Sequence, residues 1–322
     1  MTPDPECVAR FRADLDAPGR LAEGEALGIA YSGGPDSLAL LLLAHAALPG
    51  KVEAATVDHG LRPESVAEAA DAAKVCETLG VPHEVLTVEV GSGNIQAEAR
   101  RARYAALGEW AKRRGFTHVC TAHHADDQAE TFLMRANRGS GLAGLAGVRA
   151  ATTMADTGLS VLRPLLGWRR AELVEIAEQC GFPIARDPSN KDASYDRVRL
   201  RQALAKTDAI DAQGVAASAR QLATMQDSIE AMAREEYERA WSGGAYRPMS
   251  LSTAHRPALW IEVTMLIATD LGAVLTRSDA ARMVDSLLAG QPVNVGGIQA
   301  RFAKEKDETI WTFAPENPRR TG

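Results

Sequence analysis

A glycine turn separates a strand-like run from a helix-like run near the start of the chain. Residues 26–31 are apolar and favour a buried strand, and residues 38–48 favour an apolar helix. The turn between them consists of Ser32, Gly33, Gly34, Pro35, Asp36 and Ser37. A strand, a glycine turn and a helix start bring free backbone N–H groups and the positive helix end to one point, which suits an anionic phosphate. This order predicts an α/β fold with a phosphate site after its first strand.

The side chains of the turn add donors and one negative charge. Ser32 and Ser37 supply hydroxyl groups, and the carboxylate of Asp36 is of the kind that holds Mg²⁺ against phosphate oxygens. The motif G-x-x-x-x-G-K-[ST] occurs nowhere, so the lysine that grips β- and γ-phosphates in other nucleotide-binding loops is missing. The alternative interpretation is a plain strand-to-helix turn in which Asp36 and Ser37 only cap the helix.

Strands and helices alternate after the turn. The predicted strands are residues 26–31, 52–57, 83–88 and 117–122, and the predicted helices are residues 38–48, 64–79, 95–114, 126–135 and 168–180. This alternation predicts a doubly wound, mainly parallel, Rossmann-like sheet covered on both faces. Ligands of such sheets bind outside the carboxyl ends of the strands, where the glycine turn lies.

The character of the chain changes after about residue 204. Residues 215–241 predict one long charged helix that ends at the Ser-Gly-Gly of residues 242–244. Residues 256–290 then predict two helices, and the alternation in 292–313 predicts a small hairpin. We therefore expect a catalytic domain over 1–204, a helical linker over 205–244 and a small α+β domain over 245–322.

Composition and charge limit the protein's surroundings and partners. Residues 1–22 lack the apolar core of a secretory signal, and the most apolar run is too short to span a bilayer, so we expect no membrane contact. The four cysteines form no C-x-x-C, which disfavours a redox pair or a metal cluster and fits the cytoplasm. The net charge of −6 argues against nucleic acid, but residues 94–114 carry six basic and two acidic side chains. A solvated helix face is the alternative explanation for that basic run.

Two further loops carry candidate site residues. The loop after residue 57 is a neighbour of the glycine turn in such a sheet, so the backbone of Val57 and His59 is a candidate adenine or ribose cradle; a turn with Ser65 as helix cap is the alternative. In residues 121–131, Asp127 and Glu130 lie three apart and face one side of the first helical turn. Two carboxylates there suit a divalent metal or an ammonium group. Stabilisation of the helix dipole, with Asp126 or Asp127 as the cap, is the alternative.

Glycines and arginines mark the end of the first domain. Residues 138–147 are too rich in glycine for a helix interior and predict a loop. Residues 187–190 predict a turn, and an arginine ladder follows, in which Arg197 and Arg201 are i,i+4 neighbours. Guanidinium groups bind phosphate bidentately, so the ladder is a candidate contact for an RNA backbone or for a nucleotide.

Seven of these segments, in this order, resemble the tRNA(Ile)-lysidine synthetase family of the PP-loop (N-type) ATP pyrophosphatases. The matches are S-G-G-x-D-S at Ser32, V-D-H-x-L-R-x-x-S at Val57, Q-A-x-A-R-x-x-R-Y ending at Tyr104, H-x-D-D-Q-x-E-T ending at Thr131, R-G-S-G-x-x-G-L at Arg138, R-P-L-L at Arg163 and D-P-S-N-x-D-x-x-Y-x-R-x-R-x-R at Asp187. The resemblance covers residues 26–201, and the second domain resembles the family only in size and position.

The resemblance implies a reaction and a set of site residues. ATP adenylates O2 of the wobble cytidine in the isoleucine tRNA with a CAU anticodon, and the ε-amine of free L-lysine then displaces AMP from C2. ATP would be bound by Ser32, Gly33, Gly34, Pro35, Asp36, Ser37, Val57 and His59, with Asp36 on Mg²⁺. Asp36, Asp127 and Glu130 would be catalytic, and the last two would bind lysine. Phosphate or tRNA contacts would come from Arg100, Arg103, Arg197 and Arg201, and from the domain at 245–322.

Two other functions are weighed against this one. A tRNA thiolation enzyme on the same fold would typically need a catalytic cysteine pair, and this chain has none. A non-catalytic ATP-binding module would need neither the acidic cluster nor the arginine ladder. The oligomeric state stays open between a monomer and a homodimer, as does the way in which isoleucine tRNA is told from the CAU-bearing methionine tRNA.

Overall fold

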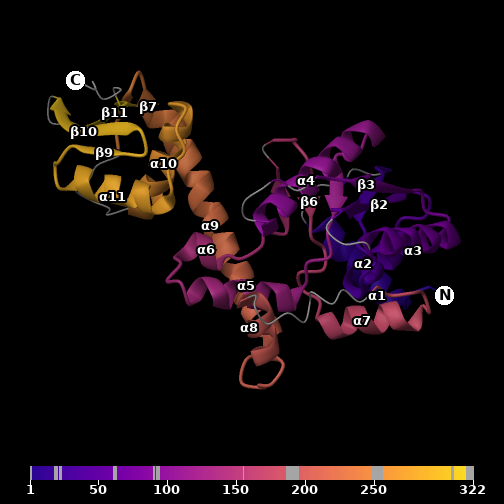
Figure 1. Ribbon diagram of the computed structural model, residues 1–322. Helices are drawn as coiled ribbons and strands as arrows, with labels where there is room; N and C mark the ends of the chain where they lie inside the picture. The colour runs from indigo at the N-terminus through magenta and orange to yellow at the C-terminus, as the bar shows by residue number, and fades with distance from the viewer. Residues whose placement is uncertain are drawn as a thin grey trace. The chain divides into compact units, whose positions relative to one another are not determined.

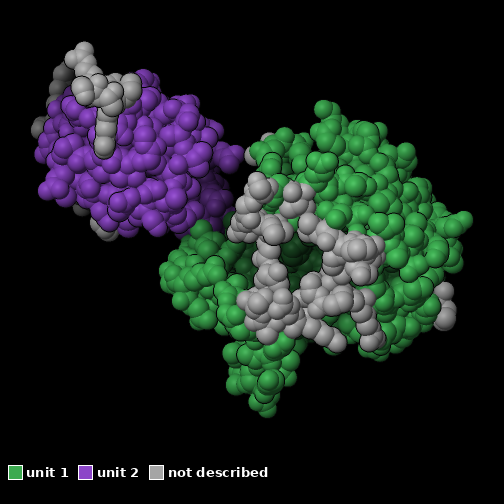
Figure 2. Space-filling model, in the orientation of Figure 1, with its two compact units in different colours: residues 1–223 green, residues 224–322 purple. Residues whose placement is uncertain are grey.

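The computed structural model describes residues 2–17, 21, 24–60, 64–89, 91, 95–154, 156–185, 196–248, 257–305 and 308–316. The chain forms two compact units, residues 1–223 and residues 224–322 (Figure 2). The boundary between the units falls within a single helix, α9 (Ala212–Ala240). The division into domains 1–204, 205–244 and 245–322 stays a prediction. The predicted turn at 187–190 and part of the loop after Val57, residues 61–63, lie outside the described residues.

The described part of the first unit contains a six-stranded sheet in the order β3-β2-β1-β4-β6-β5 (Figure 1). The strands are β1 (Leu27–Ala30), β2 (Val52–Asp58), β3 (His83–Thr87), β4 (His118–Cys120), β5 (Ala151–Thr153) and β6 (Ser160–Leu162). All pairs are parallel except that of β5 with β6 at one edge, which confirms the predicted mainly parallel sheet. Because β1 lies between β2 and β4, the order of the strands reverses at β1, and ligands of such sheets bind beyond the strand ends at that point.

Helices cover both faces of this sheet. They are α1 (Pro5–Asp16), α2 (Pro35–Ala47), α3 (Glu64–Leu79), α4 (Ile95–Arg114) and α7 (Arg170–Gln179). Three further helices, α5 (Ala125–Ala136), α6 (Leu142–Leu145) and α8 (Asp196–Leu204), form a separate group in which α6 and α8 pack on α5. Helix α2 is apolar all round because it is buried all round: it packs against α1 and α7 as well as the sheet. A second cluster, with Leu107 and Trp110 of α4, covers the opposite face. In the described part of the chain, no helix is both long and apolar enough to cross a bilayer.

Two segments of the first unit differ from the sequence-based expectations. Helix α1 was not predicted; Asp4 starts it by accepting the N–H of Glu6 at 2.7 Å. Residues 138–147 are not a loop throughout, since they contain the single helical turn α6. Arg135 Nη1 holds this segment through the carbonyl oxygens of Gly144 and Gly147. A side-chain donor fixing the backbone carbonyls can therefore order a glycine-rich segment that has little helix propensity of its own.

The second unit is an antiparallel sheet packed on two helices. Its described strands run in the order β7-β8-β11-β10-β9, and β10 with β11 forms the predicted hairpin. Their bounds are β7 (Trp241–Ser242), β8 (Ala245–Tyr246), β9 (Val293–Val295), β10 (Ile298–Glu305) and β11 (Glu308–Pro315), beside α10 (Pro257–Asp270) and α11 (Arg277–Leu288). Trp241 was expected to end the long helix but starts a strand, because Gly243 and Gly244, both at positive φ, turn the chain back. Trp260 and Trp311 meet edge-on in the core.

Candidate active site

The glycine turn between β1 and α2 is closed by its own serines. The N–H of Ser32 donates to Oγ of Ser37 at 3.1 Å, and that hydroxyl donates to the carbonyl oxygen of Gly34 at 3.0 Å. Gly33 has φ +78°, a conformation that favours glycine, and its carbonyl oxygen accepts the N–H of Ala185 at 2.9 Å. The turn is thus held rigid from within and from the segment after α7.

This turn presents unpaired backbone donors. The cap of α2 is Gly34, which makes no side-chain cap bond, and Pro35 follows it. The interpretation in which Asp36 and Ser37 cap the helix is therefore wrong. Among the described residues, the N–H groups of Gly33, Gly34, Asp36 and Ser37 donate to no partner. Free amides at the start of a helix suit an anion, and phosphate binding at this turn stays a prediction.

Asp36 lies between the ring of His124 and the guanidinium of Arg170. Its Oδ2 is 3.7 Å from Nε2 of His124 and 3.5 Å from Nε of Arg170. Burial alone would raise the pKa of Asp36, but these two contacts outweigh it and lower the pKa below its ordinary value, so the group is ionised at neutral pH. Its other oxygen, Oδ1, is buried without a hydrogen-bond partner in the described part of the chain. An ionised carboxylate with one bare oxygen fits a hard divalent cation such as Mg²⁺.

The segment after β4 approaches Asp36 from the neighbouring strand. His124 caps α5: it accepts the N–H of Asp127 at Nδ1, 3.3 Å away, and Oδ2 of Asp127 accepts the N–H of His124. The expected cap, Asp126 or Asp127, is thus His124, with Asp127 as its partner in a capping box. Asp126 is used elsewhere, since its Oδ2 accepts the N–H of Arg170 at 2.7 Å and so joins the start of α7 to the start of α5.

His124 gathers three carboxylates around a buried ring. Its Nε2 lies 3.3 Å from Asp127 and 3.7 Å from Asp36, and its Nδ1 lies 3.8 Å from Asp126. Burial would lower the pKa of His124, but the carboxylates outweigh it and raise the pKa above its ordinary value. Because Nδ1 accepts the N–H of Asp127, that contact favours a neutral His124 ring. The three carboxylates favour a positively charged ring. In either form Nε2–H faces the carboxylates, so His124 links the glycine turn to the acidic cluster.

Asp127 and Glu130 lie on one side of α5, as predicted, and two arginines of α8 cover them. Arg197 contacts Glu130 at 2.7 Å and Asp127 at 2.9 Å, and Arg201 contacts Glu130 at 2.6 Å. Glu130 is 1% exposed and engages both arginines, whereas the side chain of Asp127 is 14% exposed. The phosphate contacts expected of Arg197 and Arg201 stay predictions, and in this structure both guanidinium groups are held by carboxylates.

Comparisons with known proteins agree with this geometry. The family model of the PP-loop domain matches residues 8–208. A tRNA(Ile)-lysidine synthase from Novosphingobium aromaticivorans is 42% identical over 325 residues, which cover 96% of this chain and 94% of the relative. The chain belongs to the tRNA(Ile)-lysidine synthase family. A further relative of that name, from Zymomonas mobilis, is 50% identical over 214 residues, which cover 65% of each chain.

A solved structure shares the fold. The U34-tRNA thiolase NcsA from Methanococcus maripaludis, solved with its [4Fe-4S] cluster, superposes with a TM-score of 0.56 at 16% identity, over 68% of this chain and 78% of that one. This similarity shows the fold alone. In this chain all four cysteines are free thiols. Burial raises the pKa of the Cys76 thiol to about 12, so this thiol is not poised as a nucleophile.

The basic residues predicted on the other flank form a second group. Nη2 of Arg103 lies 3.4 Å from Nε2 of His59, and Arg100 lies over the ring of Tyr104 at 4.8 Å. Burial and the charge of Arg103 lower the pKa of His59, so its ring is neutral at pH 7. Val57 is half-buried at the end of β2, next to His59. The structure therefore brings His59 and Arg103 together. A nucleoside cradle at Val57 and His59 stays a prediction.

Three charged residues of this lysidine synthase family member were not singled out from the sequence. Arg163 is 4% exposed and donates to the carbonyl oxygen of Arg149 and to Thr152. Arg169 contacts Asp126 at 3.3 Å, and Arg170 contacts Asp36. The predicted helix at 168–180 already placed two arginines at its first turn, which is the signal that would have found Arg169 and Arg170.

Proposed function

We propose that this protein is an ATP-dependent ligase that converts the wobble cytidine of the CAU-bearing isoleucine tRNA into lysidine, in the cytoplasm. One observation carries the proposal. The glycine turn after β1 and the Asp127–Glu130 pair after β4 occupy neighbouring strand ends, and His124 joins them. A phosphate site beside a pair of carboxylates suits an adenylation followed by attack of an amine.

The first step activates the base. O2 of the cytidine attacks the α-phosphorus of ATP, the bond to the bridging oxygen breaks, and pyrophosphate leaves. The free N–H groups of Gly33, Gly34 and Ser37 bind the departing phosphates, where they oppose the charge that develops. The hydroxyls of Ser32 and Ser37 bond to each other and hold the turn in place. Asp36 would hold Mg²⁺ through its bare Oδ1, and the cation would supply charge neutralisation there. The backbone at Val57 and His59 would receive the adenosine.

The second step uses the activated base. The ε-nitrogen of lysine attacks C2, the C2–O2 bond breaks, and AMP leaves with that oxygen. Free lysine has an amine pKa of about 10.4, so the ammonium must lose a proton before it attacks. Asp127, the more accessible carboxylate, contacts the ammonium and takes part in that transfer, with buried Glu130 behind it as the second negative charge. The ammonium then competes with Arg197 and Arg201 for the same oxygens.

Binding of tRNA phosphates requires local clusters of positive side chains, because the chain as a whole has a net charge of −6. Arg103 on α4 contacts His59 of the nucleoside cradle, and Arg100 lies on the same helix. Burial and the charges of Arg163, Arg100 and Arg197 lower the pKa of His123 to about 3, so its ring is neutral. We assign phosphate contacts to Arg100 and Arg103, and further tRNA contacts to the domain at 245–322.

One experiment tests this function against its alternatives. The full chain is incubated with ATP, Mg²⁺, lysine and the CAU-bearing isoleucine tRNA, and the digested nucleosides are identified by mass spectrometry. Lysidine at the wobble position, lost when either lysine or ATP is omitted, is the expected result, with the CAU-bearing methionine tRNA as the matched control. A sulfur-containing nucleoside would indicate a thiolation enzyme. Unmodified tRNA from a protein that still binds ATP would indicate a non-catalytic module.

A further inference from the structure

The glycine turn lacks a lysine that would oppose the charge of a triphosphate, and its nearest acidic side chain, Asp36, adds to that charge. Backbone amides provide only partial charges. A full positive charge beside the turn would therefore complete an anion site. The structure places such a charge there from a distant part of the sequence, at the start of α7.

Arg170, the first residue of α7, is fixed at its backbone. Its N–H donates to Oδ2 of Asp126 at 2.7 Å. Helix α7 also packs along α2, the helix that the glycine turn begins. The position of the Arg170 backbone relative to the turn is therefore determined by two independent contacts, and only its side chain is left to move.

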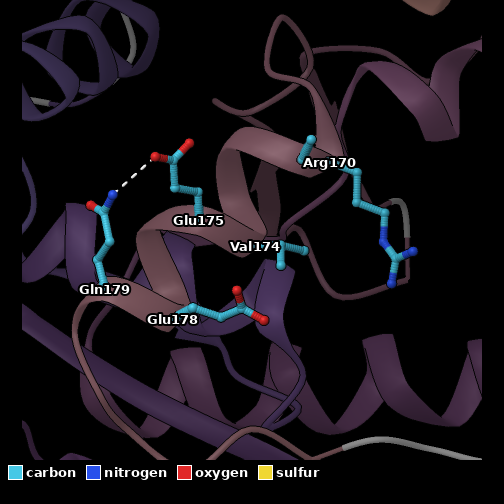
Figure 3. Close-up of a pocket in the computed structure, with 6 residues that line it drawn as sticks. Arg170, Val174, Glu175, Glu178 and Gln179 are labelled. Carbon is cyan, nitrogen blue, oxygen red and sulfur yellow. Dashed lines mark hydrogen bonds between the residues drawn. The ribbon is translucent and has the colours of Figure 1, made fainter.

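The side chain of Arg170 points to the turn. Its Nε is buried and lies 3.5 Å from Oδ2 of Asp36 but makes no hydrogen bond within the described part of the chain. The side chain as a whole is 40% exposed, so its outer nitrogens reach solvent. A pocket of about 460 Å³ runs along α7, and there Arg170 extends away from Glu175 and Glu178 of the same helix (Figure 3).

The other arginines around the site have partners in the structure. These are Arg197 and Arg201 on Glu130, Arg163 on the carbonyl oxygen of Arg149, Arg103 on His59 and Arg169 on Asp126. Arg170 differs from them, because its side chain makes no hydrogen bond among the described residues and its one described ion pair is the 3.5 Å contact with Asp36. A guanidinium with unused donors beside a phosphate turn is suited to bidentate binding of phosphate oxygens.

We propose that Arg170 binds the β- and γ-phosphates of ATP and stabilises the departing pyrophosphate, in the place that a loop lysine takes elsewhere. The proposal rests on the function proposed above. The β/γ side is favoured because Arg170 meets Asp36 but has no ion pair with Asp127 or Glu130 among the described residues, where the α-phosphorus would face the amine. A purely structural role, in which Arg170 only holds Asp36 in place, is the competing explanation.

Binding measurements without tRNA or lysine separate the two explanations. The full chain and its Arg170→Gln, Arg170→Lys and Arg169→Gln variants are titrated by calorimetry with a non-hydrolysable ATP analogue, with pyrophosphate and with AMP, all in Mg²⁺. We expect Arg170→Gln to raise the dissociation constants of the ATP analogue and of pyrophosphate by about 10- to 100-fold, which is the effect of a lost charged hydrogen bond. The dissociation constant of AMP should stay within about twofold. Arg170→Lys should recover part of the loss. Arg169→Gln, the matched control, should change the dissociation constant of none of the three ligands by more than about twofold.

The outcomes distinguish this proposal from the function it rests on. The proposal would be overturned if Arg170→Gln weakened the binding of AMP and of the ATP analogue equally, or if Arg169→Gln also lost the binding of both ligands. Either result would mean that Arg170 acts only by holding the structure in place. Unchanged binding in Arg170→Gln would also overturn it, while tight binding by the unaltered protein would leave the proposed function standing. Failure of the unaltered protein to bind the analogue would overturn both. Thermal melting of each variant shows that it is folded.

Discussion

At the scale of single residues, Asp36 has an unusual environment: His124 and Arg170 contact one of its oxygens, and the other has no hydrogen-bond partner among the described residues. We expect Asp36→Ala to reduce adenylation by at least about 100-fold, because the carboxylate that would hold Mg²⁺ is lost at the point where phosphate charge develops. The fold and tRNA affinity should change little, since Asp36 is outside the apolar core. Pyrophosphate release in the presence of tRNA measures the effect, and release at the unaltered rate would remove Asp36 from the mechanism.

Glu130 and Asp127 differ in burial, and the contribution of each carboxylate to lysine binding can be measured separately. Glu130→Gln removes one negative charge while Arg197 and Arg201 stay, so the site becomes more positive and should repel the lysine ammonium. We expect KM for lysine to rise about tenfold and KM for ATP to rise less than threefold. The accessible Asp127 makes Asp127→Asn the matched comparison, with the same direction expected. An equal rise in both KM values would place Glu130 with the nucleotide instead.

At the scale of elements, β1 is held against α4 by the absence of a side chain at Gly28. A Cβ at Gly28 would lie 2.8 Å from the ring of Trp110 and 3.0 Å from a methyl group of Val119, too close for either to accept without moving. Gly28→Ala should therefore lower the free energy of unfolding by about 1–3 kcal/mol through overpacking. Denaturant titration measures it. Gly141→Ala, at negative φ in open space, is the control and should change stability by less than about 0.5 kcal/mol.

The elements also show which patterns in a sequence carry structure and which do not. The helices at Glu64–Leu79 and Ile95–Arg114 have the predicted bounds, because long apolar periodicity reports burial directly. The two-residue strands β7 and β8 were missed, since pairing with β11 decides them and two residues show no period. At the site, Asp127 and Glu130 were found through helical spacing. Arg170 was not, because its nearness to Asp36 depends on how α7 packs on α2.

At the scale of the whole molecule, the acidic segment at residues 205–241 crosses the boundary between the two compact units at residue 223. The nucleotide motifs lie in the unit that ends at residue 223, and Nη1 of Arg149 donates to the carbonyl oxygen of Ala223 at 2.8 Å, so that unit includes the start of α9. Residues 205–241 carry seven acidic and four basic side chains, a balance that repels RNA. Any tRNA contact in the second unit must therefore come from elements beyond that helix.

A chain ending at Ala223 tests this division of labour. It keeps the glycine turn, Asp36 and the α5–α8 cluster, so we expect its affinity for ATP to stay within about twofold of the full chain. Its affinity for tRNA should fall, and the dependence of that affinity on salt should become shallower by about 0.7–0.9 for each phosphate contact that is lost. Filter binding of both chains at several salt concentrations measures both quantities, with the melting of the shortened chain as the control for folding. If tRNA affinity and salt slope are unchanged, the basic side chains of the first unit alone recognise the tRNA, and the second unit has another role.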